Sequence, residues 1–133
     1  MSLGPDTKIF IVDDDPFWNT LLCELLQGIG YSDISCFQSG FDCLDHLTEN
    51  PDVIFLDYDM QYKNGLEVLR EVKNYYLGIH VVFTTCIDKV ELAVAAMKLG
   101  AFDFILKNRV TVAEVENIFG KIRQWENRTD SIF

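Results

Sequence analysis

The chain has 133 residues, of which 49% are hydrophobic, so its size fits one domain with a single core. Its 11 basic and 21 acidic residues give a formal net charge of -10, which argues against non-specific binding of nucleic acid or of an anionic membrane by this segment. No apolar stretch reaches the roughly 18 residues that span a bilayer, and residues 1–5 lack the features of a signal peptide, so we expect a cytoplasmic protein.

Strand-like and helix-like segments alternate five times along the chain. The expected strands cover residues 8–13, 32–37, 52–57, 79–85 and 102–106. The segments between and after them carry apolar residues at steps of three and four, as Phe17, Leu21 and Leu25 do, which indicates helices. This alternation predicts an α/β fold in which a mainly parallel sheet is doubly wound, with right-handed crossovers and helices on both faces.

Capping residues mark where the helices begin and end. The expected N-terminal signals are Asp15 before Pro16, Asn64 with Glu67, Asp88 with Glu91, and Thr111 with Glu114. The expected stops are Gly30, Gly78 and Gly100. We expect the domain to cover residues 8–126, with a disordered or tag-derived start at 1–7 and a C-terminal tail or linker at 127–133.

Acidic residues stand at the ends of two expected strands. Asp57 ends one apolar run, and another run is followed by Asp13, Asp14 and Asp15. In the flavodoxin-like strand order 2-1-3-4-5, the order reverses between strands one and three, and ligands bind there, outside the carboxyl ends of the strands. Two carboxylates about 4 Å apart repel by roughly 4 kcal/mol at an effective dielectric near 20, so the cluster requires a cation. Oxygen ligands of this kind suit Mg²⁺, with Mn²⁺ or Ca²⁺ as substitutes.

The residues at these strand ends suit phosphoryl transfer. A carboxylate such as Asp57 beside Mg²⁺ can attack phosphorus if the charge of the transferred group is neutralised. Lys107 ends the fifth strand and can supply a positive charge, and Thr85 ends the fourth and can supply a hydroxyl. Taken singly, Lys107 would be a solvated lysine and Thr85 an ordinary strand residue. For Asp15, a helix N-cap is the preferred interpretation.

Five ordered motifs then carry a resemblance to a known family. They are Ile11-Val12-Asp13-Asp14-Asp15-Pro16, Phe55-Leu56-Asp57-Tyr58-Asp59-Met60, Asn64-Gly65-Leu66-Glu67, Val81-Val82-Phe83-Thr84-Thr85-Cys86 and Gly100-Ala101-Phe102-Asp103-Phe104-Ile105-Leu106-Lys107. Over about residues 8–125 the sequence resembles the receiver domains of two-component response regulators, closely those of the chemotaxis type. The resemblance implies a flavodoxin-like (βα)5 sandwich with a five-stranded parallel sheet in the order 2-1-3-4-5.

The resemblance also implies a phosphorelay function. It implies that Asp57 accepts a phosphoryl group from a sensor histidine kinase or a histidine phosphotransfer protein, and that Asp13, Asp14, Asp57 and the backbone carbonyl of Asp59 bind Mg²⁺. Such a domain is a phosphoacceptor that assists its own phosphorylation and dephosphorylation, rather than a turnover enzyme.

A switch is implied as well. By resemblance, Thr85 and Lys107 contact the phosphoryl group, and Thr85 and Phe104 form a switch that alters the surface of the fourth helix, fifth strand and fifth helix. The partner that the resemblance implies for this surface is a downstream output domain or an effector protein.

Three positions depart from the family pattern. Gln61 and Asn108 replace prolines, and Cys86 replaces an alanine. Receivers commonly have a cis bond from the lysine to its proline. Because a cis bond before a residue other than proline costs about 2.5 to 4 kcal/mol, we expect a trans bond between Lys107 and Asn108.

The sequence also allows two alternatives to a phosphorylated receiver. Asp57 and Asp59 resemble the nucleophile and acid of haloacid-dehalogenase-type phosphatases, but that reading leaves Asp13 and Asp14 unexplained. A receiver fold that serves only as a constitutive interaction module is disfavoured by the complete acidic, threonine and lysine set. The fourth helix resembles that of receivers in enhancer-binding transcription activators, so a stand-alone receiver and a piece of a larger regulator both remain open.

Overall fold

The computed structural model describes residues 3–86 and 89–132, with side chains described as far as residue 128. Its strands are β1 (Lys8–Val12), β2 (Asp33–Phe37), β3 (Val53–Asp57), β4 (His80–Thr85) and β5 (Asp103–Leu106). Its α-helices are α1 (Pro16–Gly28), α2 (Gly40–Asp45), α3 (Gly65–Tyr75), α4 (Val90–Lys98) and α5 (Val112–Ile132). The short 3-10 helices η1 (Leu47–Glu49) and η3 (Lys107–Arg109) complete the described elements.

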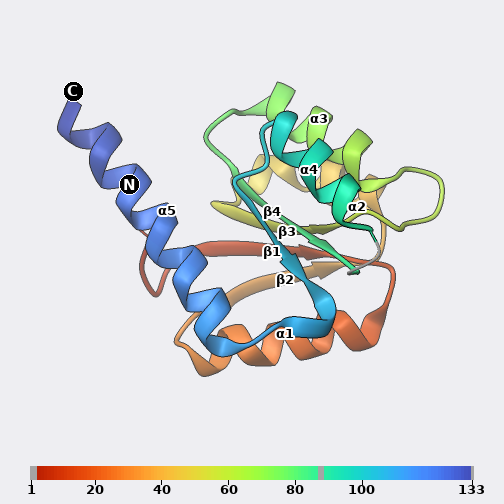
Figure 1. The fold of residues 1–133 in the computed structure, drawn as a ribbon, viewed down its shortest axis with the longest axis horizontal. Helices are drawn as coiled ribbons and strands as arrows, with labels where there is room; N and C mark the ends of the chain where they lie inside the picture. The colour runs from red at the N-terminus through yellow and green to blue at the C-terminus, as the bar shows by residue number, and fades with distance from the viewer. Residues whose placement is uncertain (1–2, 87–88, 133) are drawn as a thin grey trace.

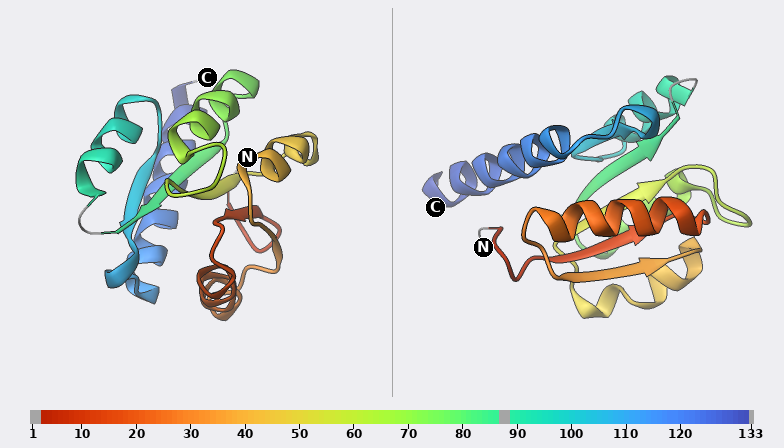
Figure 2. Two further views of the ribbon diagram at one scale, coloured as in Figure 1. Left: turned by 90° about the vertical axis from the view of Figure 1, so that its right-hand side faces the viewer. Right: turned by 90° about the horizontal axis from the view of Figure 1, so that it is seen from below.

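All five strands are parallel and lie in the order β2-β1-β3-β4-β5, which confirms the predicted flavodoxin-like topology. The helices cover both faces of the sheet (Figures 1 and 2). Trp18 and Leu22 of α1 share one hydrophobic cluster with Phe119 of α5. Val68 of α3 and Ala93 of α4 belong to the cluster on the opposite face.

The burial of each strand follows from this layering. β1, β3 and β4 lie inside the sheet between two helix layers, and every residue of β3 and β4 is buried. β2 is an edge strand, and none of its five residues is fully buried. The long apolar runs in the sequence therefore correspond to strands that have no solvent-facing side.

The N-terminal helix signals operate as predicted wherever they are described. The Asp15 side chain caps α1 by accepting from the Phe17 N–H at 2.9 Å. Asn64 and Glu67 form a reciprocal capping box at the start of α3, with bonds of 3.0 and 3.1 Å. Thr111 Oγ1 accepts from the Glu114 N–H at 3.1 Å. The predicted cap at Asp88 lies outside the described residues.

The predicted glycine stops are correct at two of three positions. Gly30 and Gly100 follow α1 and α4 with φ angles of 109° and 108°, where a residue with a Cβ would be strained. Gly78 does not cap α3, because that helix has already ended at Tyr75 and the next residue is extended.

Both ends of the expected domain make further structure. Leu3 is buried against the α1 and α5 side of the sheet, and the Thr7 N–H donates to the Gly4 carbonyl at 2.9 Å. At the other end, α5 extends to Ile132. The sequence after Gly120 contains neither Gly nor Pro, so no residue there breaks the helix. None of the described helices is long and apolar enough to cross a membrane.

Candidate functional site

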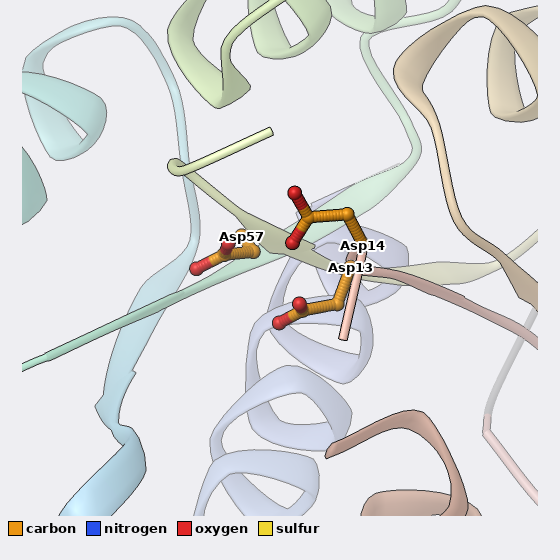
Figure 3. Close-up of side chains that lie close together, drawn as sticks. All are labelled: Asp13, Asp14 and Asp57. Atoms are coloured by element: carbon orange, nitrogen blue, oxygen red, sulfur yellow. The ribbon is translucent and has the colours of Figure 1, made fainter. Parts of the chain in front are cut away.

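Three carboxylates meet at the carboxyl ends of two neighbouring strands. Asp13 follows β1 and Asp57 ends β3, and these strands pair with Val12 opposite Leu56. One carboxylate oxygen from each of Asp13, Asp14 and Asp57 lies within 4.8 Å of the other two, as Figure 3 illustrates. Asp13 and Asp57 are buried and Asp14 is exposed. The predicted acidic cluster at this edge of the sheet therefore forms.

The spacing of the cluster fits a small divalent cation. A six-coordinate Mg²⁺ ion with oxygen ligands at about 2.1 Å places neighbouring ligands about 3.0 Å apart and opposite ligands about 4.2 Å apart, and both spacings lie below the 4.8 Å limit within which these oxygens fall. The ligand set is all oxygen, as a hard cation requires. Because Asp14 faces solvent, the site also has room for the water molecules that Mg²⁺ usually keeps.

Lys107 joins the cluster from the far side of β4. It follows β5 as the first residue of η3, and its ammonium lies 2.5 Å from Asp13 Oδ2 and 3.1 Å from Asp57 Oδ1. The predicted charge at the strand edge is thus already paired with the two buried carboxylates. The peptide bond from Lys107 to Asn108 is trans, as predicted, and no peptide bond in the described part of the chain is cis.

The electrostatics of the site are dominated by burial. Burial, reinforced by the neighbouring Asp13 carboxylate, raises the pKa of Asp57 to about 7, although Lys107 opposes this. Burial also raises the pKa of Asp13, against hydrogen bonds from Lys107 and the Asp15 N–H. Burial alone would lower the pKa of Lys107, but its hydrogen bonds and charge interactions with Asp13 and Asp57 together raise it. One ammonium does not fully neutralise the cluster, so a further cation is electrostatically favoured.

The start of α1 fixes the orientation of Asp13. The Asp13 Oδ1 atom accepts from the Asp15 N–H at 2.9 Å, and the Asp13 carbonyl accepts from Asn19 Nδ2 at 2.9 Å. The Asp15 side chain is used for capping, which confirms the preferred interpretation of this acid. Sequence reasoning missed Asn19. The available signal was a polar residue at a position of α1 that is buried against the sheet.

Thr85 and Phe104 lie on the same face of adjacent strands. Thr85 of β4 pairs with Leu106, and Phe83 pairs with Phe104. Since side chains alternate along a strand, Thr85 and Phe104 both face the α3 and α4 layer. Thr85 is buried, whereas Phe104 is half-buried against that layer.

Thr84 faces the opposite layer and was not singled out by sequence reasoning. It lies opposite Asp57 in the pairing of β3 with β4. Its hydroxyl is buried and has no hydrogen-bond partner within the described part of the chain. The Thr84-Thr85 pair therefore offers a matched comparison of two buried threonines on opposite faces of one strand.

The loop after β3 is held close to the sheet. The Gly65 N–H donates to the Tyr58 carbonyl at 3.0 Å. A Cβ atom on Gly65 would lie 2.3 Å from the Asp57 carbonyl oxygen, so the start of α3 packs directly against the end of β3. The Asp59 side chain is exposed and lies 3.7 Å from the ammonium of Lys89. The Asp59 carboxylate is not one of the three in the cluster, but its charge adds to the rise that burial causes in the pKa of Asp57.

One aromatic contact completes the site. The ammonium of Lys107 lies 5.3 Å from the ring centroid of Trp18, within the range of a cation–π interaction. Trp18 is 7% exposed and its indole nitrogen has no hydrogen-bond partner among the described residues. Sequence reasoning did not predict this contact.

Comparison with known proteins establishes the family. The model of the response regulator receiver domain matches residues 9–119, so the chain belongs to this family of two-component signalling domains. The family match gives no support to the interpretation of Asp57 and Asp59 as phosphatase residues.

Individual relatives agree with this assignment. The transcriptional regulatory protein ZraR of Klebsiella oxytoca is 34% identical over 105 residues, covering 78% of this chain and 24% of that protein. The DNA-binding transcriptional regulator NtrC of Klebsiella pneumoniae is 36% identical over 99 residues, covering 74% of this chain and 21% of that protein. The chain thus spans about a quarter or less of the length of these relatives. A solved response regulator receiver domain protein from Clostridium thermocellum superposes with a TM-score of 0.82 at 27% identity, covering 96% of this chain and 99% of that one.

Proposed function

We propose that the chain accepts a phosphoryl group on Asp57 from the phosphohistidine of a sensor histidine kinase or histidine phosphotransfer protein. The observation that carries this proposal is the placement of Asp57. One of its carboxylate oxygens lies within 4.8 Å of carboxylate oxygens of Asp13 and Asp14, and its Oδ1 atom lies 3.1 Å from the Lys107 ammonium. A nucleophilic oxygen, a cation-binding set and a fixed positive charge therefore share one strand edge.

The metal in this proposal is Mg²⁺. The side chains of Asp13, Asp14 and Asp57 and the backbone carbonyl of Asp59 would hold it, with water in the remaining positions. When bound, Mg²⁺ would neutralise negative charge on the oxygens of the transferred group. Metal binding requires an ionised Asp57, whose pKa is raised to about 7, so binding is coupled to loss of a proton from this residue.

The residues then act by position and charge. A carboxylate oxygen of Asp57 attacks phosphorus, a P–O bond to Asp57 forms, and the P–N bond to the donor breaks. The donor imidazole leaves and takes up a proton. Lys107 exchanges its contact with Asp57 for a charge-assisted hydrogen bond to a phosphoryl oxygen. The Thr85 hydroxyl donates to another phosphoryl oxygen and carries the signal to Phe104 on the same face.

The surface that reads this signal is the edge formed by α4, β5 and α5. β5 is the last strand of the sheet, with α4 over one face and α5 over the other (Figure 1). α4 exposes apolar side chains there, among them Val94 and Met97 at 48% and 39% exposure. An apolar surface of this kind fits a partner or an effector domain.

Intact mass measurement after treatment with acetyl phosphate tests the proposal. We expect one added phosphoryl group in the presence of Mg²⁺, none in EDTA, and none for Asp57→Asn. The control is Asp45→Asn, which changes an exposed aspartate of α2 and should phosphorylate normally. Phosphorylation that persists in Asp57→Asn would show that the assignment is wrong.

A further inference from the structure

Lys107 has few local constraints on where its ammonium lies. Its side chain is a flexible four-carbon stem, and it begins a short 3-10 turn in which Asn108 and Arg109 are exposed. Among the residues that the structure describes, its ion pairs are with Asp13 and Asp57. Under the proposed function, both carboxylates become engaged by the metal and the phosphoryl group. The ion pairs therefore cannot by themselves hold the ammonium in place during transfer.

Trp18 is the neighbour that does not change during this exchange. It lies in the first turn of α1, which Asp15 and Pro16 start immediately after the acidic residues. Its ring belongs to the buried cluster between the sheet, α1 and α5, so the surrounding packing fixes its orientation. The ring lies 5.3 Å from the Lys107 ammonium. The contact depends on neither ionised carboxylate.

The unpartnered indole nitrogen indicates what the tryptophan contributes. Trp18 Nε1 is buried without a hydrogen-bond partner among the described residues, which destabilises the fold relative to an apolar side chain of similar bulk. Leucine or phenylalanine would avoid that cost, although each is smaller and would fill less of the space. The feature that neither supplies equally is the indole ring face, the strongest cation–π acceptor among the side chains.

We propose that Trp18 is a positioning residue that holds the Lys107 ammonium at the strand edge. The ammonium is then in place to contact the phosphoryl group when the metal and the phosphoryl group engage Asp13 and Asp57. This inference rests on the proposed function of Asp57 and adds a residue that acts on the reaction through Lys107.

A double-mutant cycle with acetyl phosphate and Mg²⁺ tests the proposal. We expect Trp18→Leu to slow phosphorylation of Asp57 between about 5-fold and 30-fold, the rate equivalent of a cation–π contact in a partly desolvated site, with Trp18→Phe in between. In a Lys107→Ala background the same Trp18→Leu change should alter the rate by less than about twofold, because its target is already absent. The control Trp125→Leu removes the other tryptophan, which lies on α5 beside Glu126 at the opposite end of the sheet, and should leave the rate unchanged.

A second measurement needs neither metal nor phosphoryl group. In wild type, the NMR signals of the Lys107 side-chain methylene protons should be displaced upfield by the indole ring current. The displacement should shrink in Trp18→Phe and vanish in Trp18→Leu. Unchanged lysine shifts in Trp18→Leu would overturn the proposal, as would an equal rate loss in the presence and absence of Lys107. If wild type is not phosphorylated at all, the proposed function of Asp57 fails, and the methylene shifts alone decide whether Trp18 holds the lysine.

Discussion

His80 and Glu126 join the first residue of β4 to the last third of α5. The His80 Nε2 and Glu126 Oε1 atoms are 3.1 Å apart, and the two side chains are 11% and 17% exposed. Glu126 favours a charged imidazole, but burial has the larger effect and lowers the pKa of His80 below its usual range. At neutral pH the imidazole is therefore neutral and donates its Nε2 proton to the carboxylate.

This contact predicts a loss of stability in mild acid. A base whose pKa is lower in the folded than in the unfolded protein stabilises the fold above its unfolded pKa of about 6.5, and this stability is lost as the pH falls toward the folded value. We expect His80→Gln to reduce the fall in the free energy of unfolding between pH 7.5 and pH 5. Urea denaturation at both pH values measures this. The exposed His46, changed to Gln, is the control and should behave as wild type. Parallel pH profiles for wild type and His80→Gln would contradict the prediction.

The contribution of Asp57 to stability has the opposite pH dependence to that of His80. Its pKa is raised from 3.8 to about 7, so its contribution to stability is present in acid and is lost as the pH rises through about 7. In EDTA, Asp57→Asn should gain stability over wild type on going from pH 5 to pH 8, by as much as about 3 kcal/mol, because roughly two pH units of the interval between the unfolded and folded pKa values lie within this range. Added Mg²⁺ should stabilise wild type but not the variant at pH 8. The same difference between the two proteins at pH 5 and pH 8 would rule out a raised pKa for Asp57.

Gly65 is predicted to admit no side chain. A Cβ there would lie 2.3 Å from the Asp57 carbonyl oxygen, and both the helix start and the strand end would have to shift. We expect Gly65→Ala to lower the free energy of unfolding by about 1 to 3 kcal/mol, as overpacking does. Gly28→Ala is the matched control, because a Cβ on this last residue of α1 meets nothing within 4 Å. If both variants unfold at the same urea concentration as wild type, the close approach of α3 to β3 is not a constraint.

Replacing each of the two buried threonines of β4 in turn distinguishes a switching role of Thr85 from the general effect of losing a buried side chain. Beryllofluoride, which mimics a phosphoryl group, should shift the NMR signals of Phe104 and of Ala93 and Met97 in α4. Thr85→Ala should abolish most of these shifts, since Thr85 faces the same layer as Phe104. Thr84→Ala, which changes the neighbour that faces the other layer, should retain them. Equal shifts in wild type and Thr85→Ala would show that the signal reaches α4 by another route.

The local pattern of the sequence was sufficient to predict the strands and several helix starts. It also predicted the edge of the sheet at which the site lies. Apolar runs placed each strand to within one residue, and the signals at Asp15 and Asn64 placed two helix starts. Asp13 and Asp57 could be brought together from sequence because parallel strands in a doubly wound sheet all end at one edge. The same rule places Thr85 and Lys107 at this edge, because each stands at the end of a parallel strand.

Other features depend on contacts between distant segments. Lys107 and Asp13 are 94 positions apart in sequence, and their 2.5 Å contact depends on how β5 and β1 are placed within the sheet. The support of Asp13 by Asn19, the Trp18 ring beside Lys107 and the contact of His80 with Glu126 have no local signature either. Periodicity and capping report the conformation of neighbouring residues and the face each one takes, because those are set by backbone sterics within a few residues. Distances between side chains on different elements, and the pKa values that burial gives them, are decided only when the layers pack.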